Sequence, residues 1–280
     1  MSAIRVTKLP AGDRAPVLGQ GTWKMGEDSR RHADEVAALK FGIDLGLTLI
    51  DTAEMYANGR AETVVADAVA GRRAEVFIVS KVLPSNASRR GVETACENSL
   101  KRLRTDTIDL YLLHWRGSVP LAETIAAFEA LKVSGKIRHW GVSNFDTDDM
   151  EELASLAAGS SVQANQVLYN PHRRGIEIDL IPWCLGRGIP IMAYSPIGQG
   201  AILRDAKLVA MAEKHGATAA QIVLAWVMRQ DGVIAIPKAS QPQHARDNRA
   251  ALDIRLTGDD LAEIDRLFPP PRRKQPLEMI

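Results

Sequence analysis

Residues 76–114 read VFIVSKVLPSNASRRGVETACENSLKRLRTDTIDLYLLH, and their pattern indicates the architecture of the whole chain. Two near-continuous apolar runs, Val76–Val82 and Ile108–His114, flank a segment with helical spacing at Gly91–Leu103. Apolar runs of this kind are typical of parallel strands that are buried on both faces. A strand, a helix and a second strand in this order predict a βαβ unit.

The same alternation continues on both sides of this unit. The other predicted strands are Leu18–Trp23, Thr48–Ala53, Ile137–Asn144, Val162–Val167, Ile189–Pro196 and Val233–Ala239. The other predicted helices are Asp34–Leu45, Leu121–Val133, Ala206–Lys214, Thr218–Gln230 and one that opens at Thr257 and ends near Phe268. Eight strands with intervening helices predict a closed (β/α)8 TIM barrel of the α/β class, preceded by a hairpin around Ala11–Asp13.

An open doubly wound sheet is the competing architecture. It predicts a G-x-G-x-x-G fingerprint after the first strand, where the glycines allow a tight turn and close helix packing. The first strand instead contains Gly19-Gln20-Gly21-Thr22-Trp23-Lys24, with a bulky tryptophan and a lysine in that place. We therefore expect one barrel domain over residues 1–280, a length that is ordinary for this fold. We expect the final residues 269–280, PPPRRKQPLEMI, to be extended on the surface.

The composition argues against several classes of partner. The 35 basic and 34 acidic residues are mixed along the chain and leave a formal net charge of +1, so we expect neither nucleic acid nor an anionic membrane as a partner. No stretch reaches the length of apolar residues that a membrane span needs. The N-terminal residues lack a signal-peptide pattern, and Cys96 and Cys184 fit no metal spacing. We expect a cytoplasmic monomer that binds no metal.

Polar side chains interrupt the apolar pattern near the ends of three successive strands. Asp51 lies in IDTAEMY, Lys81 ends VSK and His114 lies in LLHW. Tyr56 closes the first of these motifs. Each alone has a structural explanation, as a turn cap, a rim lysine, a packed imidazole or a loop aromatic. Together they indicate an active site, because the C-terminal strand ends of a barrel carry its catalytic groups.

These four residue types suit the reduction of a carbonyl group. Hydride attack on carbon must be accompanied by proton delivery to oxygen, and a free tyrosine titrates near pH ~10. The Lys81 cation is expected to lower the pKa of Tyr56, and Asp51 to keep Lys81 charged. His114 would orient the carbonyl and share the donated proton. The hydride must come from a cofactor, since no side chain supplies one.

Short segments in a fixed order along the chain resemble the aldo-keto reductase family. They are GTW (Gly21–Trp23), DTAEMY (Asp51–Tyr56), SK (Ser80–Lys81), LLHW (Leu112–Trp115), GVSNF (Gly141–Phe145), NQVLYNP (Asn165–Pro171), YSPIG (Tyr194–Gly198) and IPKA (Ile236–Ala239). The resemblance implies that Tyr56 is the general acid, that Lys81 and Asp51 tune it, and that His114 is the fourth catalytic residue. It also implies a substrate pocket lined by Trp23, Tyr56, His114 and Trp115.

The resemblance further implies a nicotinamide cofactor, with NADPH favoured over NADH. The residues that match the family's cofactor site are Gly21, Thr22, Trp23, Asp51, Ser143, Asn144, Gln166, Tyr194, Ser195, Pro196, Ile197, Gly198, Lys238, Ser240, His244 and Asn248. Ser143, Asn144 and Gln166 match the residues that hold the carboxamide. Tyr194 matches the aromatic side chain that stacks on the nicotinamide, and Asn248 the residue that meets adenine. Lys238 and Ser240 match the 2′-phosphate site, and a lysine at the start of the last helix suits a phosphate.

Two departures from the family pattern bear on specificity. His244 stands where the family often has an arginine, and histidine is a weaker phosphate partner. Only Gln199–Arg204 separates YSPIG from the next predicted helix, and the C-terminus lacks a long loop to shape a pocket. We therefore expect an open site, similar to that of short bacterial members that reduce methylglyoxal and other small aldehydes.

Two other functions are compatible with a barrel that carries these residues. One is a Schiff-base aldolase with Lys81 as the nucleophile, which requires a neutral lysine. The other is a non-catalytic module that binds NADPH, which only turnover distinguishes from an enzyme.

Overall fold

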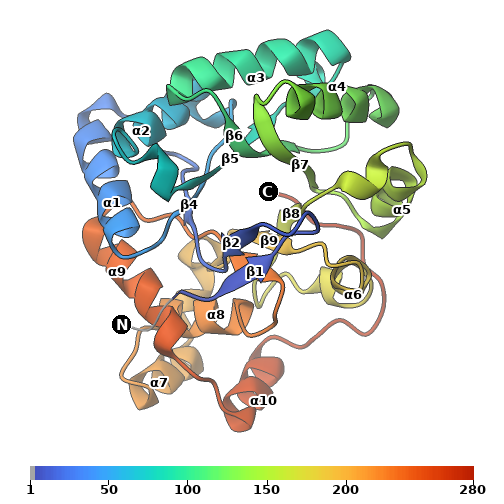
Figure 1. Cartoon of the computed structure of the whole chain (residues 1–280). Helices are drawn as coiled ribbons and strands as arrows, with labels where there is room; N and C mark the ends of the chain where they lie inside the picture. Colours follow the sequence, from blue (N-terminus) through green and yellow to red (C-terminus); the bar gives the residue numbers. More distant parts are fainter. Residues whose placement is uncertain (1–3) are drawn as a thin grey trace.

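A computed structural model describes residues 4–280 and contains one sheet of eight parallel strands in sequential order (Figure 1). The strands are β3 (Gln20–Gly21), β4 (Leu49–Asp51), β5 (Phe77–Val82), β6 (Ile108–Leu113), β7 (Ile137–Ser143), β8 (Asn165–Leu168), β9 (Ile191–Tyr194) and β10 (Val233–Ala235). Parallel bridges from Leu18 to Ala235 and from Gly21 to Lys238 join the first and last strands. The predicted (β/α)8 barrel is therefore confirmed.

Gly21 allows this closure. Its N–H donates to the carbonyl oxygen of Pro237 at 3.0 Å, and a Cβ at this position would lie 2.7 Å from the carbonyl oxygen of Ile236. A side chain would thus force the two edge strands apart. The second glycine of the Gly-x-Gly pair in the first strand serves barrel closure.

Helices surround the barrel (Figure 1). They are α1 (His32–Asp44), α2 (Arg60–Ala68), α3 (Arg89–Leu103), α4 (Leu121–Val133), α5 (Thr147–Ser155), α6 (Leu180–Leu185), α7 (Ala206–Lys214), α8 (Ala219–Val227), α9 (Pro242–Ala250) and α10 (Gly258–Leu267). The bounds of α4 and α7 agree with the sequence prediction. The prediction missed α2, α5 and α6, which have nine residues or fewer, and it expected a helix after Lys238, where α9 lies, without giving its bounds. No helix within residues 4–280 is both long enough and apolar enough to cross a membrane.

The predicted N-terminal hairpin is present and plugs one end of the barrel. It consists of β1 (Val6–Lys8) and β2 (Arg14–Pro16), and Leu9 and Ala15 are buried in the cluster that fills the barrel interior. Asp13 lies 2.6 Å from His139 Nε2 in β7. The hairpin therefore covers the end where the strands begin, opposite the carboxyl ends that line the large cavity.

The segment after α10 is extended, as predicted, but it is anchored at several points. Lys274 Nζ pairs with Asp148 at 2.8 Å and with Asp179 at 3.3 Å. Arg173 Nη1 pairs with Glu278 Oε1 at 2.5 Å. In Figure 1 this segment, in dark red, runs from α10 past α6 and back to the middle of the view. These contacts bring the end of the segment to the mouth of the barrel.

Candidate active site

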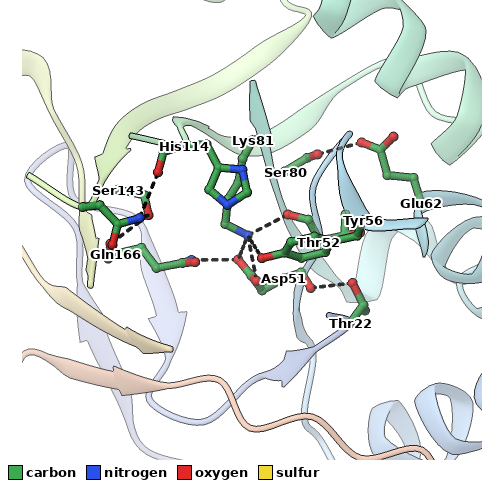
Figure 2. Close-up of polar contacts among 11 residues, drawn as sticks. Thr22, Asp51, Thr52, Tyr56, Glu62, Ser80, Lys81, His114, Ser143 and Gln166 are labelled. Carbon is green, nitrogen blue, oxygen red and sulfur yellow. Dashed lines mark hydrogen bonds and ion pairs between the residues drawn. The ribbon is translucent and has the colours of Figure 1, made fainter. Parts of the chain in front are cut away.

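Lys81, at the carboxyl end of β5, is the centre of a buried polar cluster (Figure 2). Its ammonium donates to both carboxylate oxygens of Asp51 and to the carbonyl oxygen of Thr52, each at 2.8 Å. Its Nζ also lies 3.3 Å from the hydroxyl of Tyr56. The side chain of Lys81 is 0% exposed, so protein groups and not water surround its ammonium. The barrel thus brings together three of the four predicted catalytic residues.

The charges in this cluster are set by burial as well as by pairing. Burial lowers the pKa of Lys81, and the carboxylate of Asp51 opposes that shift. Burial, and then the charge of Asp51, raise the pKa of Tyr56 well above its ordinary value. The pKa of Tyr56 is therefore raised overall and is not brought down toward neutrality, as the sequence analysis expected. The loss of water around the phenol outweighs the nearby cation.

His114, at the end of β6, is the fourth predicted catalytic residue and lies against Tyr56. The two rings are 5.8 Å apart between centroids in an edge-to-face arrangement. Burial, and then the charge of Lys81, lower the pKa of His114 to about 2. Its buried Nδ1 has no hydrogen-bond partner among the described residues. The imidazole is therefore neutral at physiological pH.

Side-chain amides and hydroxyls from three neighbouring strand ends form a second polar cluster. Asn144 donates to the carbonyl oxygen of His114 at 3.1 Å and accepts from the hydroxyl of Tyr194 at 2.9 Å. The hydroxyl of Ser143 donates to the carbonyl oxygen of Gln166 at 2.8 Å. The backbone of Asn144 is in the left-handed region with φ 57°, which asparagine tolerates better than most residues. This network holds the Tyr194 ring in place before any ligand arrives.

Both clusters face one cavity of about 670 Å³ at the carboxyl ends of the strands. The predicted site residues that line it are Gly21, Trp23, Asp51, Tyr56, His114, Trp115, Ser143, Asn144, Gln166, Tyr194, Ser195, Pro196, Ile197 and Lys238. Lys81 and Thr22 lie behind this wall, both fully buried, and Thr22 donates its hydroxyl to the carbonyl oxygen of Asp51 at 2.9 Å. Gly198 lines the adjoining cavity.

The cavity wall also includes residues that the sequence analysis did not select. They are Lys24, Met55, Gln199, Ile236, Pro237, Met279 and Ile280. Lys24 follows the GTW motif directly, and Met55 lies inside DTAEMY, so both could have been found from the motifs. Met279 and Ile280 carried no such signal. They show that the C-terminal segment does shape the pocket, contrary to the expectation, because its ion pairs hold it there.

Two lysines place positive charge at one side of the cavity. Lys24 Nζ lies 4.6 Å from the ring centroid of Trp23, and Lys24 and Lys238 both line the cavity. Burial, and then the charge of Arg31, lower the pKa of Lys238. The lowered pKa indicates a cation that lacks sufficient counter-charge, a condition that an anionic ligand relieves.

Three predicted cofactor residues lie outside this cavity wall. Ser240 precedes α9, and His244 and Asn248 lie within it. Lys238 precedes α9, which is not the last helix, since α10 follows it. His244 is exposed, whereas Asn248 is buried. The guanidinium of Arg246, on the same helix, lies over the ring of Phe41 at 5.2 Å from its centroid.

The family is decided by a match over most of the chain. Residues 17–268 match the model of the aldo/keto reductase family. The chain is an aldo-keto reductase. It is therefore an oxidoreductase, and the resemblance inferred from the ordered motifs is confirmed.

Named relatives are similar to this aldo-keto reductase over nearly their whole length. Methylglyoxal reductase YeaE of Escherichia coli is 52% identical over 95% of each chain. Glyoxal reductase of Bacillus subtilis is 36% identical over 93% of this chain and 91% of its own. The crystal structure of an aldo-keto reductase from Klebsiella pneumoniae in complex with NADPH has 51% identity and a TM-score of 0.97, with each chain fully covered.

Proposed function

We propose that this chain reduces aldehydes and ketones to alcohols with NADPH, and that small aldehydes such as methylglyoxal are among its substrates. The relatives named as methylglyoxal and glyoxal reductases support the substrate class, and the NADPH in the Klebsiella structure supports the coenzyme. The observation that carries the proposal is the chain of contacts from Asp51 through Lys81 to the hydroxyl of Tyr56 at the cavity wall.

The polar and aromatic groups of the cavity fit a nicotinamide coenzyme. Gln166 uses its Nε2 to donate to Asp51 at 2.7 Å, which leaves its amide oxygen to accept from a carboxamide. We assign the carboxamide to Ser143, Asn144 and Gln166, and the face of the nicotinamide ring to Tyr194. Lys238 is assigned to the 2′-phosphate. When bound, the coenzyme supplies the hydride that reduces the carbonyl carbon.

Tyr56 is the proton donor in this proposal. Its raised pKa keeps the hydroxyl protonated at neutral pH, so a proton is available for the carbonyl oxygen. The Lys81 ammonium, 3.3 Å from that hydroxyl, stabilises the phenolate that forms as the proton leaves. Asp51 keeps the ammonium charged and aimed through its two hydrogen bonds.

His114 orients the substrate carbonyl. A neutral imidazole carries one N–H, and a buried N–H without an acceptor is unfavourable. Because the buried Nδ1 has no partner among the described residues, we place the proton on Nε2. From the cavity wall, Nε2–H can donate to the same oxygen that receives the Tyr56 proton. This refines the earlier expectation, since a histidine with a pKa of about 2 does not carry the transferred proton.

The Schiff-base alternative conflicts with the surroundings of Lys81. An amine nucleophile must be neutral and must reach the substrate carbon. Lys81 donates to Asp51 and Thr52 and is 0% exposed, so its nitrogen has neither property.

The test is an assay of NADPH oxidation with methylglyoxal, glyoxal, nitrobenzaldehydes and aldoses, repeated with NADH. We expect turnover of the small aldehydes and a higher kcat/KM with NADPH. NADPH binding without turnover of any carbonyl would favour the non-catalytic module. Trapping of a substrate on Lys81 by borohydride would favour the aldolase.

A further inference from the structure

Tyr56 is followed by a loop with an unfavourable backbone. Ala57, Asn58 and Gly59 have φ angles of 49°, 55° and 83°, so three successive residues lie in the left-handed region. A Cβ atom makes this conformation costly, and isolated chains rarely adopt it at consecutive positions. Contacts elsewhere must therefore hold the loop that carries the Tyr56 hydroxyl.

A buried carboxylate in the first turn of α2, directly after this loop, makes such contacts. Glu62 is 0% exposed, and its Oε1 accepts from the hydroxyl of Ser80 at 2.7 Å (Figure 2). Its Oε2 accepts from Nε of Arg102, in α3. Both carboxylate oxygens are thus bound, as a buried anion requires.

Arg102 also touches the loop itself. A Cβ built on Gly59 would lie 2.5 Å from Nε of Arg102, so the guanidinium rests directly on the backbone of Gly59. The same guanidinium donates to the hydroxyl of Ser99 at 3.1 Å, which ties it to α3. The last left-handed residue of the loop is therefore covered by the group that binds Glu62.

The second partner of Glu62 lies beside the catalytic lysine. Ser80 and Lys81 are consecutive in β5, and successive side chains of a strand point to opposite faces. Ser80 points outward to α2, while Lys81 points inward to Asp51 and Tyr56. One carboxylate therefore connects the segment that carries the proton donor with the strand that carries its lysine.

We infer that Glu62, held by Arg102 and Ser80, is a positioning residue that sets the Tyr56 hydroxyl against the Lys81 ammonium. The inference rests on the proposed function. Glu62 also acts by its charge, because its carboxylate opposes the effect of burial on the pKa of Lys81. Two separable effects follow, one on geometry and one on the protonation of Lys81.

The test compares Glu62→Gln with the wild-type enzyme in NADPH-dependent aldehyde reduction. We expect kcat to fall about tenfold or more, since small misplacements of catalytic groups have large effects on rate, while the Kd for NADPH stays unchanged. The basic limb of the kcat–pH profile should move to lower pH, because Lys81 loses a neighbouring anion that favours its charged form. A purely structural role would lower stability without moving this limb.

Asp67→Asn provides a matched control. Asp67 in α2 pairs with Arg104, which follows α3, at 2.6 Å, so it joins the same two helices, but with side chains that are 31% and 59% exposed. This variant should keep the wild-type kcat and pH profile. Ser80→Ala, which keeps the carboxylate but removes its link to β5, should lower kcat without moving the basic limb.

Wild-type activity and an inactive Tyr56→Phe variant are established first, so that failure of the proposed function is recognised separately. If Glu62→Gln then has the wild-type kcat and pH profile and only a lower melting temperature, the inference is overturned. If Glu62→Gln does not fold, an unchanged kcat in Ser80→Ala overturns it.

Discussion

The side-chain amide of Gln166 donates a hydrogen bond to Asp51 Oδ1 at 2.7 Å, across the inside of the barrel between β8 and β4. Asp51 also receives both hydrogen bonds from Lys81 and is only 3% exposed. The amide cluster assigned to the nicotinamide and the buried ion pair behind Tyr56 are therefore one network. A change in the amide cluster should therefore affect the ion pair, and the reverse.

Gln166→Leu tests this connection. The substitution removes a donor from a buried carboxylate and a polar group from the coenzyme site, and each such loss costs about 1–3 kcal/mol. We expect weaker NADPH binding and a lower kcat together. Gln163→Leu is the control, because Gln163 lies at the opposite end of the barrel, where it accepts from the N–H of Ala11 at 2.8 Å. A Gln166→Leu variant that loses only NADPH affinity, with kcat intact, would show that the network does not couple the two parts.

Tyr56→Phe should abolish nearly all carbonyl reduction while NADPH binding stays almost unchanged. The ring can keep its contact with His114, and only the proton donor is lost. Removing a positioned acid lowers turnover by roughly 10²-fold or more. Single-turnover kinetics and coenzyme fluorescence titration measure the two effects separately. A variant that retains half of the wild-type kcat would contradict the assignment of Tyr56 as the donor.

Because of His114, the folded chain should be less stable in mild acid than at neutral pH. Its pKa of about 2 in the folded chain lies far below the ordinary value of 6.5, so the unfolded state binds a proton that the folded state does not. The contribution of His114 to the free energy of unfolding is fully present above pH ~6.5. It decreases as the pH falls below that value, by up to about 1.4 kcal/mol per pH unit. Urea unfolding of the wild type and of His114→Gln at several pH values measures this slope. Equal slopes would mean that His114 is not held neutral in the folded chain.

Lys238→Met tests the coenzyme assignment. If Lys238 pairs with the 2′-phosphate, the variant should bind NADPH more weakly by ~1.5–3 kcal/mol, the usual cost of losing a charge-assisted contact, and bind NADH as before. His244→Arg should act in the opposite direction and tighten NADPH alone, because it adds a permanent cation on α9. Fluorescence titration with both coenzymes provides the internal control. Equal effects of Lys238→Met on NADPH and NADH would show that this lysine does not recognise the phosphate.

Much of the architecture could be predicted from spacing along the chain. The predicted helices Leu121–Val133 and Ala206–Lys214 have the observed bounds, and each of the eight strands overlaps a predicted strand. Apolar periodicity is a local property, so adjacent residues reveal it. The helix at Pro242–Ala250 was expected after Lys238 but its bounds were not predicted, because its segment, PQHARDNRA, contains few apolar residues and depends on packing against α1 and α8.

The residue types of the site were also readable, because the strands of a barrel must bring their carboxyl ends together. Asp51, Lys81 and His114 therefore meet as predicted. The electrostatics of these residues could not be predicted. Burial raises the pKa of Tyr56 despite its lysine neighbour, and that burial arises only when the barrel closes. The contact of Gln166 with Asp51 and the presence of Met279 in the cavity wall likewise depend on groups far apart in the chain. Local patterns fix which side chains a strand end presents, whereas solvent exclusion and long-range contacts, which set their chemistry, arise when the chain closes on itself.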